Sequence, residues 1–318
     1  MRYVLRADAS PFIGAGHVMR SSAIAEELIA RGQDVIFIGH IVNLPWVEER
    51  IATLGFSQIY STSKEFFPSA ESDILLLDSY EIELDDSFIA LSNWLHVVAI
   101  VDALTPSYRC SLRIHPGLDS SWTGESSTPI LAGPNYIPFR KALSQKIKTP
   151  NRGNEQLKIA VVAGGSDPYH LVLEVAKTLH HTPGDFEVYV FTNSSSESTL
   201  DARFHYVEIG AKLDELTQDV DLVLTTSSTS CLEFLARGLC VGVACSVDNQ
   251  EQYYNSLGEL GVAAQIGFRN IKNQWELDEE RIHLLVSSVE FRSRLISRAA
   301  GLIDFKGAER IVDAIMAL

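Results

Sequence analysis

Short apolar runs alternate along the chain with longer stretches in which apolar residues recur at helical spacing. In the stretch 18–31, Ile24, Ala25 and Leu28 follow that spacing, and Gly32 comes next as a stop signal. The apolar runs predict strands at 3–5, 35–38, 74–77, 97–101, 158–162, 188–191, 222–224 and 241–244. The amphipathic stretches predict helices at 18–31, at 47–54, around 172–179 and as three segments within 277–318. This alternation is typical of α/β proteins with parallel sheets.

A polar stretch near the middle of the chain predicts a domain boundary. Residues 144–156 include Pro150, Asn151 and Gly153 and separate two α/β series. We therefore expect two Rossmann-like domains, at residues 1–145 and 156–318, with a linker at 146–155.

Composition and charge exclude several classes of protein. The 318 residues are 46% hydrophobic and 21% charged, which is typical of a globular protein and not of a disordered one. The formal net charge of −15 argues against nucleic acid as a partner, because general phosphate binding needs surplus Lys and Arg on one face. A phosphate-bearing ligand would need a local site made of helix N-termini and backbone N–H groups.

The four cysteines have neither zinc-site spacing nor the density of a disulfide framework, which favours reduced thiols: Cys110, Cys231, Cys240 and Cys245. The chain starts on a strand pattern and contains no apolar run of transmembrane length. We expect a cytoplasmic protein without stable membrane insertion, as a monomer or a weak dimer.

The densest candidate for chemistry is the loop between the first strand and the first helix. Gly14 and Gly16 allow a tight turn, but Met19 stands where a dinucleotide fingerprint has its third glycine, which disfavours nicotinamide chemistry. His17 opens the predicted helix, where the macrodipole favours the neutral imidazole that a general base needs. A lone histidine at a helix start is more often a solvated end residue.

Aspartates end three of the predicted strands. Asp8, Asp78 and Asp102 follow strands of one sheet, and the carboxyl ends of parallel strands meet at the edge where α/β proteins bind ligands. Each of them alone is also a common cap for the next turn or helix.

Two loops in the second half are candidates for a phosphate site. Paired glycines in the segment Gly164-Gly165-Ser166-Asp167 expose N–H groups before a helix. Hydroxyls fill 225–230 before another helix, and Glu233 lies one turn inside it, where a carboxylate can accept ribose hydroxyls. The alternative for both loops is ordinary helix capping, and Cys231 is expected to be a small buried residue.

In combination these motifs resemble the UDP-2,4-diacetamido-2,4,6-trideoxy-β-L-altropyranose hydrolases of pseudaminic acid biosynthesis (PseG) and the related spore-coat polysaccharide protein SpsG. The resemblance covers nearly the whole chain. Its most specific part is Arg6-Ala7-Asp8 followed by Ile13-Gly14-x-Gly16-His17-x-x-Arg20. Weaker matches follow in order: Asp78-Ser79-Tyr80, Gly133-Pro134-x-Tyr136 with Arg140, the paired-glycine segment, Glu233, Asn249-Gln250 and Lys306-Gly307-Ala308-x-Arg310.

The resemblance implies a GT-B fold like that of MurG, with two Rossmann-like domains whose parallel sheets face an interdomain cleft. It implies His17 as the catalytic base, with Asp8 and Tyr80 beside it, and no cofactor or metal, although Asp8 and His17 could in principle share a metal. The implied sugar-binding residues are Arg6, Gly14, Gly16, Arg20, Asp78, Tyr136 and Arg140. The implied UDP-binding residues are Gly164, Gly165, Ser166, Asp167, Ser228, Thr229, Glu233, Asn249 and Gln250.

The sequence departs from the family pattern at two places. Ser227-Ser228-Thr229-Ser230 replaces a glycine-bearing loop, which changes the space for phosphate, and Ser21-Ser22 replaces Cys-Leu after Arg20.

The expected activity is hydrolysis of a UDP-linked deoxy-diacetamido sugar at the anomeric carbon, with inversion and release of UDP. One alternative is a GT-B glycosyltransferase with a sugar or lipid acceptor, for which the segment 41–46 is a thin indication. Another is a non-catalytic nucleotide-sugar-binding protein.

Overall fold

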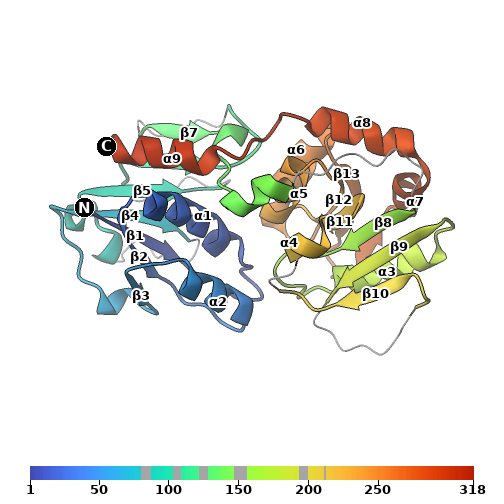
Figure 1. Cartoon of the computed structure of the whole chain (residues 1–318), viewed down its shortest axis with the longest axis horizontal. Coiled ribbons are helices and arrows are strands. Elements are labelled where there is room, and N and C mark those ends of the chain that lie inside the picture. The colour runs from blue at the N-terminus through green and yellow to red at the C-terminus, as the bar shows by residue number, and fades with distance from the viewer. Residues whose placement is uncertain (80–86, 103–108, 122–127, 147–155, 193–199, 211–212) are drawn as a thin grey trace. The chain divides into compact units, whose positions relative to one another are not determined.

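The computed structural model describes residues 1–79, 87–102, 109–121, 128–146, 156–192, 200–210 and 213–318. The chain divides into two compact units (Figure 1). Unit 1 comprises residues Met1–Lys141 and Asp304–Leu318, and unit 2 comprises Ala142–Ile303.

Among its described residues, unit 1 contains a seven-stranded parallel sheet in the order β3-β2-β1-β4-β5-β6-β7. Its strands are β1 (Arg2–Ala7), β2 (Asp34–Ile38), β3 (Gln58–Tyr60), β4 (Asp73–Asp78), β5 (His96–Ile100), β6 (Leu112–His115) and β7 (Ile130–Ala132). Its helices are α1 (Gly16–Ala30), α2 (Pro45–Thr53) and α9 (Gly307–Met316). The strand order reverses between β1 and β4, and such a switch point is where α/β proteins bind ligands.

The strands of unit 1 are apolar on both sides because each side of the sheet is covered. Tyr3 and Leu5 of β1 pack on the side of α1, α2 and α9, and Val4 between them packs on the other side, beneath Phe66 and Trp94. Strands buried on both sides appear in the sequence as continuous apolar runs, as the sequence analysis found.

The described residues of unit 2 also contain a seven-stranded sheet, in the order β10-β9-β8-β11-β12-β13-β14, with only β14 antiparallel. Its strands are β8 (Leu157–Val161), β9 (Phe186–Phe191), β10 (Phe204–Val207), β11 (Leu222–Thr226), β12 (Cys240–Cys245), β13 (Ala264–Arg269) and β14 (Trp275–Leu277). Its helices are α3 (Leu171–His181), α4 (Leu213–Leu216), α5 (Thr229–Ala236), α6 (Glu251–Leu260), α7 (Glu279–Ser287) and α8 (Val289–Ala299). Its strand order reverses between β8 and β11.

The structure differs from the predicted domain division at the end of the chain. The sequence analysis assigned 304–318 to the second domain, but these residues belong to unit 1, where α9 lies on the blue and green elements in Figure 1. Ile311, Val312 and Ile315 of α9 are fully buried in the core that also contains Leu28 of α1. The apolar stripe of α9 therefore completes unit 1. The predicted linker lies almost wholly outside the described residues.

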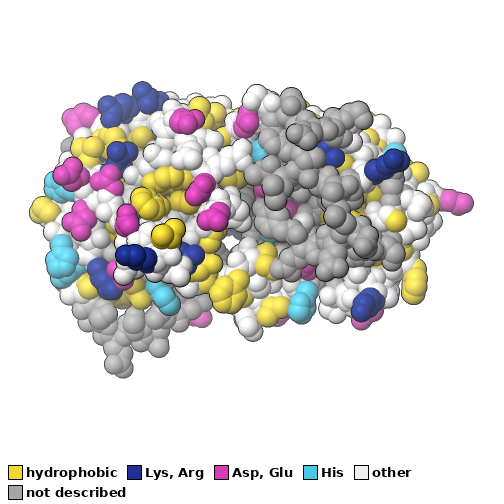
Figure 2. Space-filling view, turned by 180° about the vertical axis from the view of Figure 1, so that it is seen from behind, with side chains coloured by type: hydrophobic (Ala, Val, Ile, Leu, Met, Phe, Trp, Pro, Cys, Tyr) yellow, Lys and Arg dark blue, Asp and Glu magenta, His cyan; other side chains and the backbone are white. Residues whose placement is uncertain are grey.

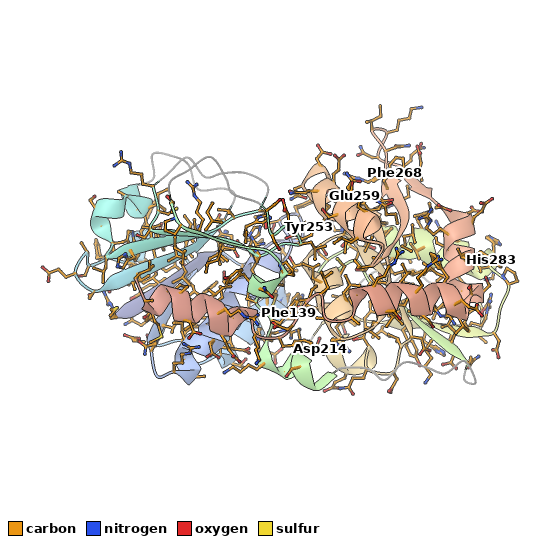
Figure 3. The ribbon with its side chains drawn as sticks, turned by 90° about the horizontal axis from the view of Figure 1, so that it is seen from above. Phe139, Asp214, Tyr253, Glu259, Phe268 and His283 are labelled. Atoms are coloured by element: carbon orange, nitrogen blue, oxygen red, sulfur yellow. The ribbon has the colours of Figure 1, made fainter. Side chains whose placement is uncertain are left out.

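Side-chain contacts fix α9 in that position. Arg31 at the end of α1 donates to Asp313 over 2.6 Å. Phe139 and Phe305 pack with their ring centroids 5.9 Å apart, and Phe139 is labelled beside this region in Figure 3. A Cβ on Gly307 would lie 2.0 Å from the carbonyl oxygen of Ile137, so only glycine fits at the start of α9.

Candidate functional site

The loop after β1 is a compact turn, and it places the start of α1 at the switch point of unit 1. The N–H of Gly14 donates to the carbonyl of Ser10 over 2.7 Å, and the N–H of Ile13 donates to the Ser10 hydroxyl. Gly14 has a φ of 84°, a conformation that favours glycine. His17 therefore lies in the first turn of α1, as the sequence predicts.

His17 pairs with the aspartate that ends β4. Its Nδ1 lies 2.6 Å from Oδ1 of Asp78, a carboxylate with no exposed surface, and His17 itself is 6% exposed. Donation from Nδ1 to Asp78 places the lone pair of a neutral ring on Nε2, the atom that can accept a proton. The pair thus has the geometry of a base held by an orienting carboxylate.

Arg20, one turn further along α1, holds that carboxylate and a second one. Its guanidinium donates to both oxygens of Asp78 over 2.6 Å and to Asp102 Oδ1 over 2.7 Å. Burial alone would raise the pKa of Asp78, but the charge of Arg20 and the hydrogen bonds from Arg20 and His17 outweigh it and hold that pKa below its ordinary value. We call these four residues the His17 cluster: His17, Arg20, Asp78 and Asp102.

The other predicted residues of unit 1 lie in different places. Asp8 accepts from Arg6 over 2.5 Å and from the backbone N–H of His40 over 2.7 Å. Tyr136 and Arg140 lie near the start of α9, where Arg310 donates to the carbonyl of Asn135. Gly16 is the first residue of α1, and Tyr80 lies outside the described residues.

In unit 2, the loop after β8 reaches the start of α3 and is named here the glycine loop (residues 163–170). Gly164 has a φ of 79°, which favours glycine, and Gly165 and Ser166 follow it in the turn. Asp167 accepts from the N–H groups of Leu171 and Val172 over 2.9 and 3.0 Å. This carboxylate therefore caps α3, and its burial raises its pKa.

The loop after β11 lies against the glycine loop and is named here the hydroxyl loop (residues 226–230). A Cβ on Gly164 would lie 3.5 Å from Ser230 Oγ and 3.9 Å from Ser228 Oγ. Ser228 makes no side-chain cap for α5, which begins at Thr229. The hydroxyls of Ser228 and Ser230 thus lie at the N-terminus of α5, beside the glycine loop, at the switch point of unit 2.

Glu233 lies half-buried within α5, and Asn249 is exposed after β12. Gln250 accepts the N–H of Ser246 with its side-chain oxygen over 2.9 Å, and its own carbonyl accepts from the hydroxyl of Ser227 over 3.3 Å. Gln250 therefore joins the loop after β12 to the hydroxyl loop. The structure brings the predicted UDP-binding residues to one edge of the second sheet.

Cys231, in the first turn of α5, is fully buried, and burial raises the pKa of its thiol to about 12. A thiol of this kind is a packing residue.

The sequence analysis did not identify two side chains near these loops, Arg269 and Tyr169. Arg269 at the end of β13 lies over the ring of Tyr169, with its guanidinium carbon 3.6 Å from the ring centroid. Arg269 and Tyr169 are far apart along the sequence, so no motif spacing indicates their contact.

In the part of the chain that the structure describes, no group of three or more His, Cys, Asp or Glu side chains could hold a metal ion. On the face shown in Figure 2, acidic and basic side chains of unit 2 are mixed. Within the described ranges, no helix is both long and apolar enough to cross a bilayer.

Comparison with known proteins supports the fold. No family model matches the chain. The chain is 22% identical over 318 residues to an uncharacterised protein of Methanocaldococcus jannaschii, covering 92% of this chain but only 65% of that protein. It is 21% identical over 282 residues to the UDP-2,4-diacetamido-2,4,6-trideoxy-β-L-altropyranose hydrolase of Campylobacter jejuni, covering 82% of this chain and 97% of that protein.

Solved structures with a similar fold include MurG and several glycosyltransferases. MurG of Acinetobacter baumannii matches with a TM-score of 0.66 at 12% identity and full coverage of both chains. The spinosyn forosaminyltransferase SpnP matches with a TM-score of 0.63 at 11% identity, again over both whole chains. The kitacinnamycin glycosyltransferase matches with a TM-score of 0.62 at 15% identity, over 99% of this chain and 98% of the other. The chain therefore has the GT-B fold, with two Rossmann-like units.

Proposed function

We propose that this protein is an enzyme that transfers a glycosyl group from a nucleotide sugar, with UDP as the nucleotide. The observation that carries the proposal is the His17 cluster, because a histidine held by a buried carboxylate at a switch point is suited to removing a proton from an attacking hydroxyl. A lone solvated histidine at a helix start would need neither Asp78 nor Arg20.

The glycine and hydroxyl loops support the nucleotide part of the proposal. The hydroxyls of Ser228 and Ser230 lie at the N-terminus of α5 beside Gly164, and that helix end favours the negative charge of a leaving diphosphate. Glu233, one turn into α5, is the proposed partner of the ribose hydroxyls. These groups are proposed to stabilise charge on the leaving diphosphate.

The two versions of the proposal differ in the acceptor of the glycosyl group, which is a sugar or lipid hydroxyl in one and water in the other. The similar solved structures are glycosyltransferases, which favours a sugar or lipid hydroxyl as acceptor. The relative from Campylobacter jejuni is a hydrolase, which favours water and a diacetamido sugar. In both versions His17 accepts the proton of the attacking O–H group, and the anomeric configuration inverts.

Turnover of UDP- and TDP-linked sugars in ¹⁸O-water, followed by mass spectrometry, tests the proposal and identifies the acceptor. Label on the anomeric hydroxyl of free sugar indicates hydrolysis, and sugar on an added acceptor indicates transfer. His17→Ala should reduce turnover by about 10²–10⁴-fold, the usual contribution of a general base. Label in the nucleotide product, or unchanged turnover by His17→Ala, would contradict the mechanism, and UDP binding without turnover would support the non-catalytic alternative.

A further inference from the structure

The β13–β14 hairpin borders the loops of unit 2 that are proposed to bind nucleotide. β13 pairs with β12 on one side and with β14 on the other. Asn270 shapes the turn between them, because its side-chain oxygen accepts from the N–H groups of Lys272 and Gln274 over 2.8 and 3.1 Å. Phe268, labelled in Figure 3, marks the position of this hairpin on unit 2. The hairpin contacts the glycine loop and the loop after β12.

Arg269, the last residue of β13, contacts two loops at once. Its guanidinium carbon lies 3.6 Å from the ring centroid of Tyr169, in the glycine loop. Its Nε donates to the carbonyl of Ser246, in the loop after β12, over 3.0 Å. A planar guanidinium can lie flat on an aromatic ring while an N–H in its plane donates a hydrogen bond, and a lysine ammonium cannot do both in this way.

Further hydrogen bonds hold the same two loops. The indole N–H of Trp275, in β14, donates to the carbonyl of Tyr169 over 2.8 Å. The N–H of Ser246 donates to the side chain of Gln250 over 2.9 Å, so both backbone groups of Ser246 are bonded. Trp275 and Arg269 of the hairpin thus hold the glycine loop, and Arg269 also holds the loop 246–250.

We propose that Arg269 is a positioning residue for nucleotide binding, which rests on the proposed function of unit 2. By tying Tyr169 to Ser246, it keeps the glycine loop and the loop 246–250 at the spacing at which both contact one nucleoside diphosphate. Loops that are already ordered before binding lose less conformational entropy when the ligand arrives, which raises affinity. Arg269 acts in this way through the two loops and not through the reacting atoms.

Calorimetry with UDP tests this role. Arg269→Met keeps the aliphatic stem but removes the donor and the charge, and it should weaken UDP affinity roughly three- to thirtyfold, from loss of a cation–π contact and a hydrogen bond. Tyr169→Leu should act in the same direction. Tyr169→Phe is the matched control, because it keeps the aromatic face, and its affinity should stay within about twofold of the wild type.

Kinetics separate positioning from catalysis and from general stability. Arg269→Met should raise KM for the nucleotide sugar and leave kcat near the wild-type value, because the His17 cluster belongs to unit 1. Arg269→Lys should recover part of the loss. If Arg269→Met does not fold, Trp275→Phe removes one donor to the glycine loop while retaining a ring, and it should also weaken UDP binding.

Wild-type UDP affinity in Arg269→Met, with or without a lower melting temperature, would overturn the positioning role while leaving the proposed function intact. A wild-type protein that binds neither UDP nor TDP would remove the proposed function and this inference together.

Discussion

At the scale of single residues, the His17 cluster explains why a carboxylate lies in the interior of unit 1. Burying an isolated charge is costly, and Asp78 is tolerated because Arg20 donates to both of its oxygens and His17 contacts one of them. The sequence analysis assigned Asp78 and Arg20 to sugar binding. Their burial instead favours a role in holding His17.

Asp78→Asn should separate that role from simple packing. An amide cannot accept from Arg20 with both of its polar atoms, and it carries no charge to stabilise a protonated imidazole. Turnover should fall by about 10²–10⁴-fold. The free energy of unfolding should fall by about 3–5 kcal/mol, the usual cost of removing one partner of a buried ion pair. Steady-state kinetics and urea unfolding measure the two effects.

Ser21→Ala is the control for Asp78→Asn, because Ser21 makes only a 3.3 Å hydrogen bond to the same carboxylate. Its turnover should remain close to that of the wild type. UDP affinity should be unchanged in both variants, since the proposed nucleotide loops belong to unit 2. Equal turnover by Asp78→Asn and Ser21→Ala would show that Asp78 does not orient His17.

At the scale of elements, the docking of α9 depends on a close backbone approach. Gly307 lies against the carbonyl of Ile137, which cannot move aside as a flexible side chain could. Three motif residues of the family resemblance, Tyr136, Gly307 and Arg310, meet in this region. Their common location indicates that this part of the motif maintains the fold.

Gly307→Ala should therefore destabilise unit 1. The added methyl group forces α9 away from Ile137, at a cost of about 1–3 kcal/mol in the free energy of unfolding. Gly210→Ala is the control, because no described atom lies within 4 Å of a Cβ at that position. Urea unfolding of both variants measures the difference, and equal stabilities would refute the tight approach at Gly307.

The sequence predicts some elements closely and misses others, including the six-residue β13 and the ten-residue α6. The helix predicted at 18–31 and the strand predicted at 74–77 correspond to α1 and β4 within a few residues. Strands of three or four residues, such as β3 and β7, were missed because so few positions cannot show a repeating pattern of apolar residues. The sequence also placed His17 and Asp78 at one sheet edge, but it could not show that Arg20 turns inward, since tertiary packing decides that orientation.

At the scale of the whole molecule, unit 2 is continuous in sequence and unit 1 is not. A fragment of residues 142–303 contains the complete second sheet and the proposed nucleotide loops. It should unfold cooperatively and bind UDP with an affinity within about tenfold of the intact chain, because the proposed nucleotide contacts all belong to it. Calorimetry on the fragment measures this affinity.

A chain truncated to residues 1–303 lacks α9. Unit 1 of this truncated chain should have a lower free energy of unfolding. Removing Ile311, Val312 and Ile315 exposes apolar surface on α1 and the first sheet, which should increase binding of a hydrophobic dye. UDP binding by this chain should remain. A truncated chain that unfolds like the full one would contradict the assignment of α9 to unit 1.

The return of α9 to unit 1 also sets an order of events during synthesis on the ribosome. Residues 304–318 are translated after the whole of unit 2, so nascent unit 1 waits on the order of ten seconds for its last helix at ~5–20 residues per second. Unit 2 can finish folding in that interval, whereas the side of the first sheet that receives α9 stays uncovered. A chaperone that recognises apolar surface would therefore meet this protein at its N-terminal half, although that half leaves the ribosome first.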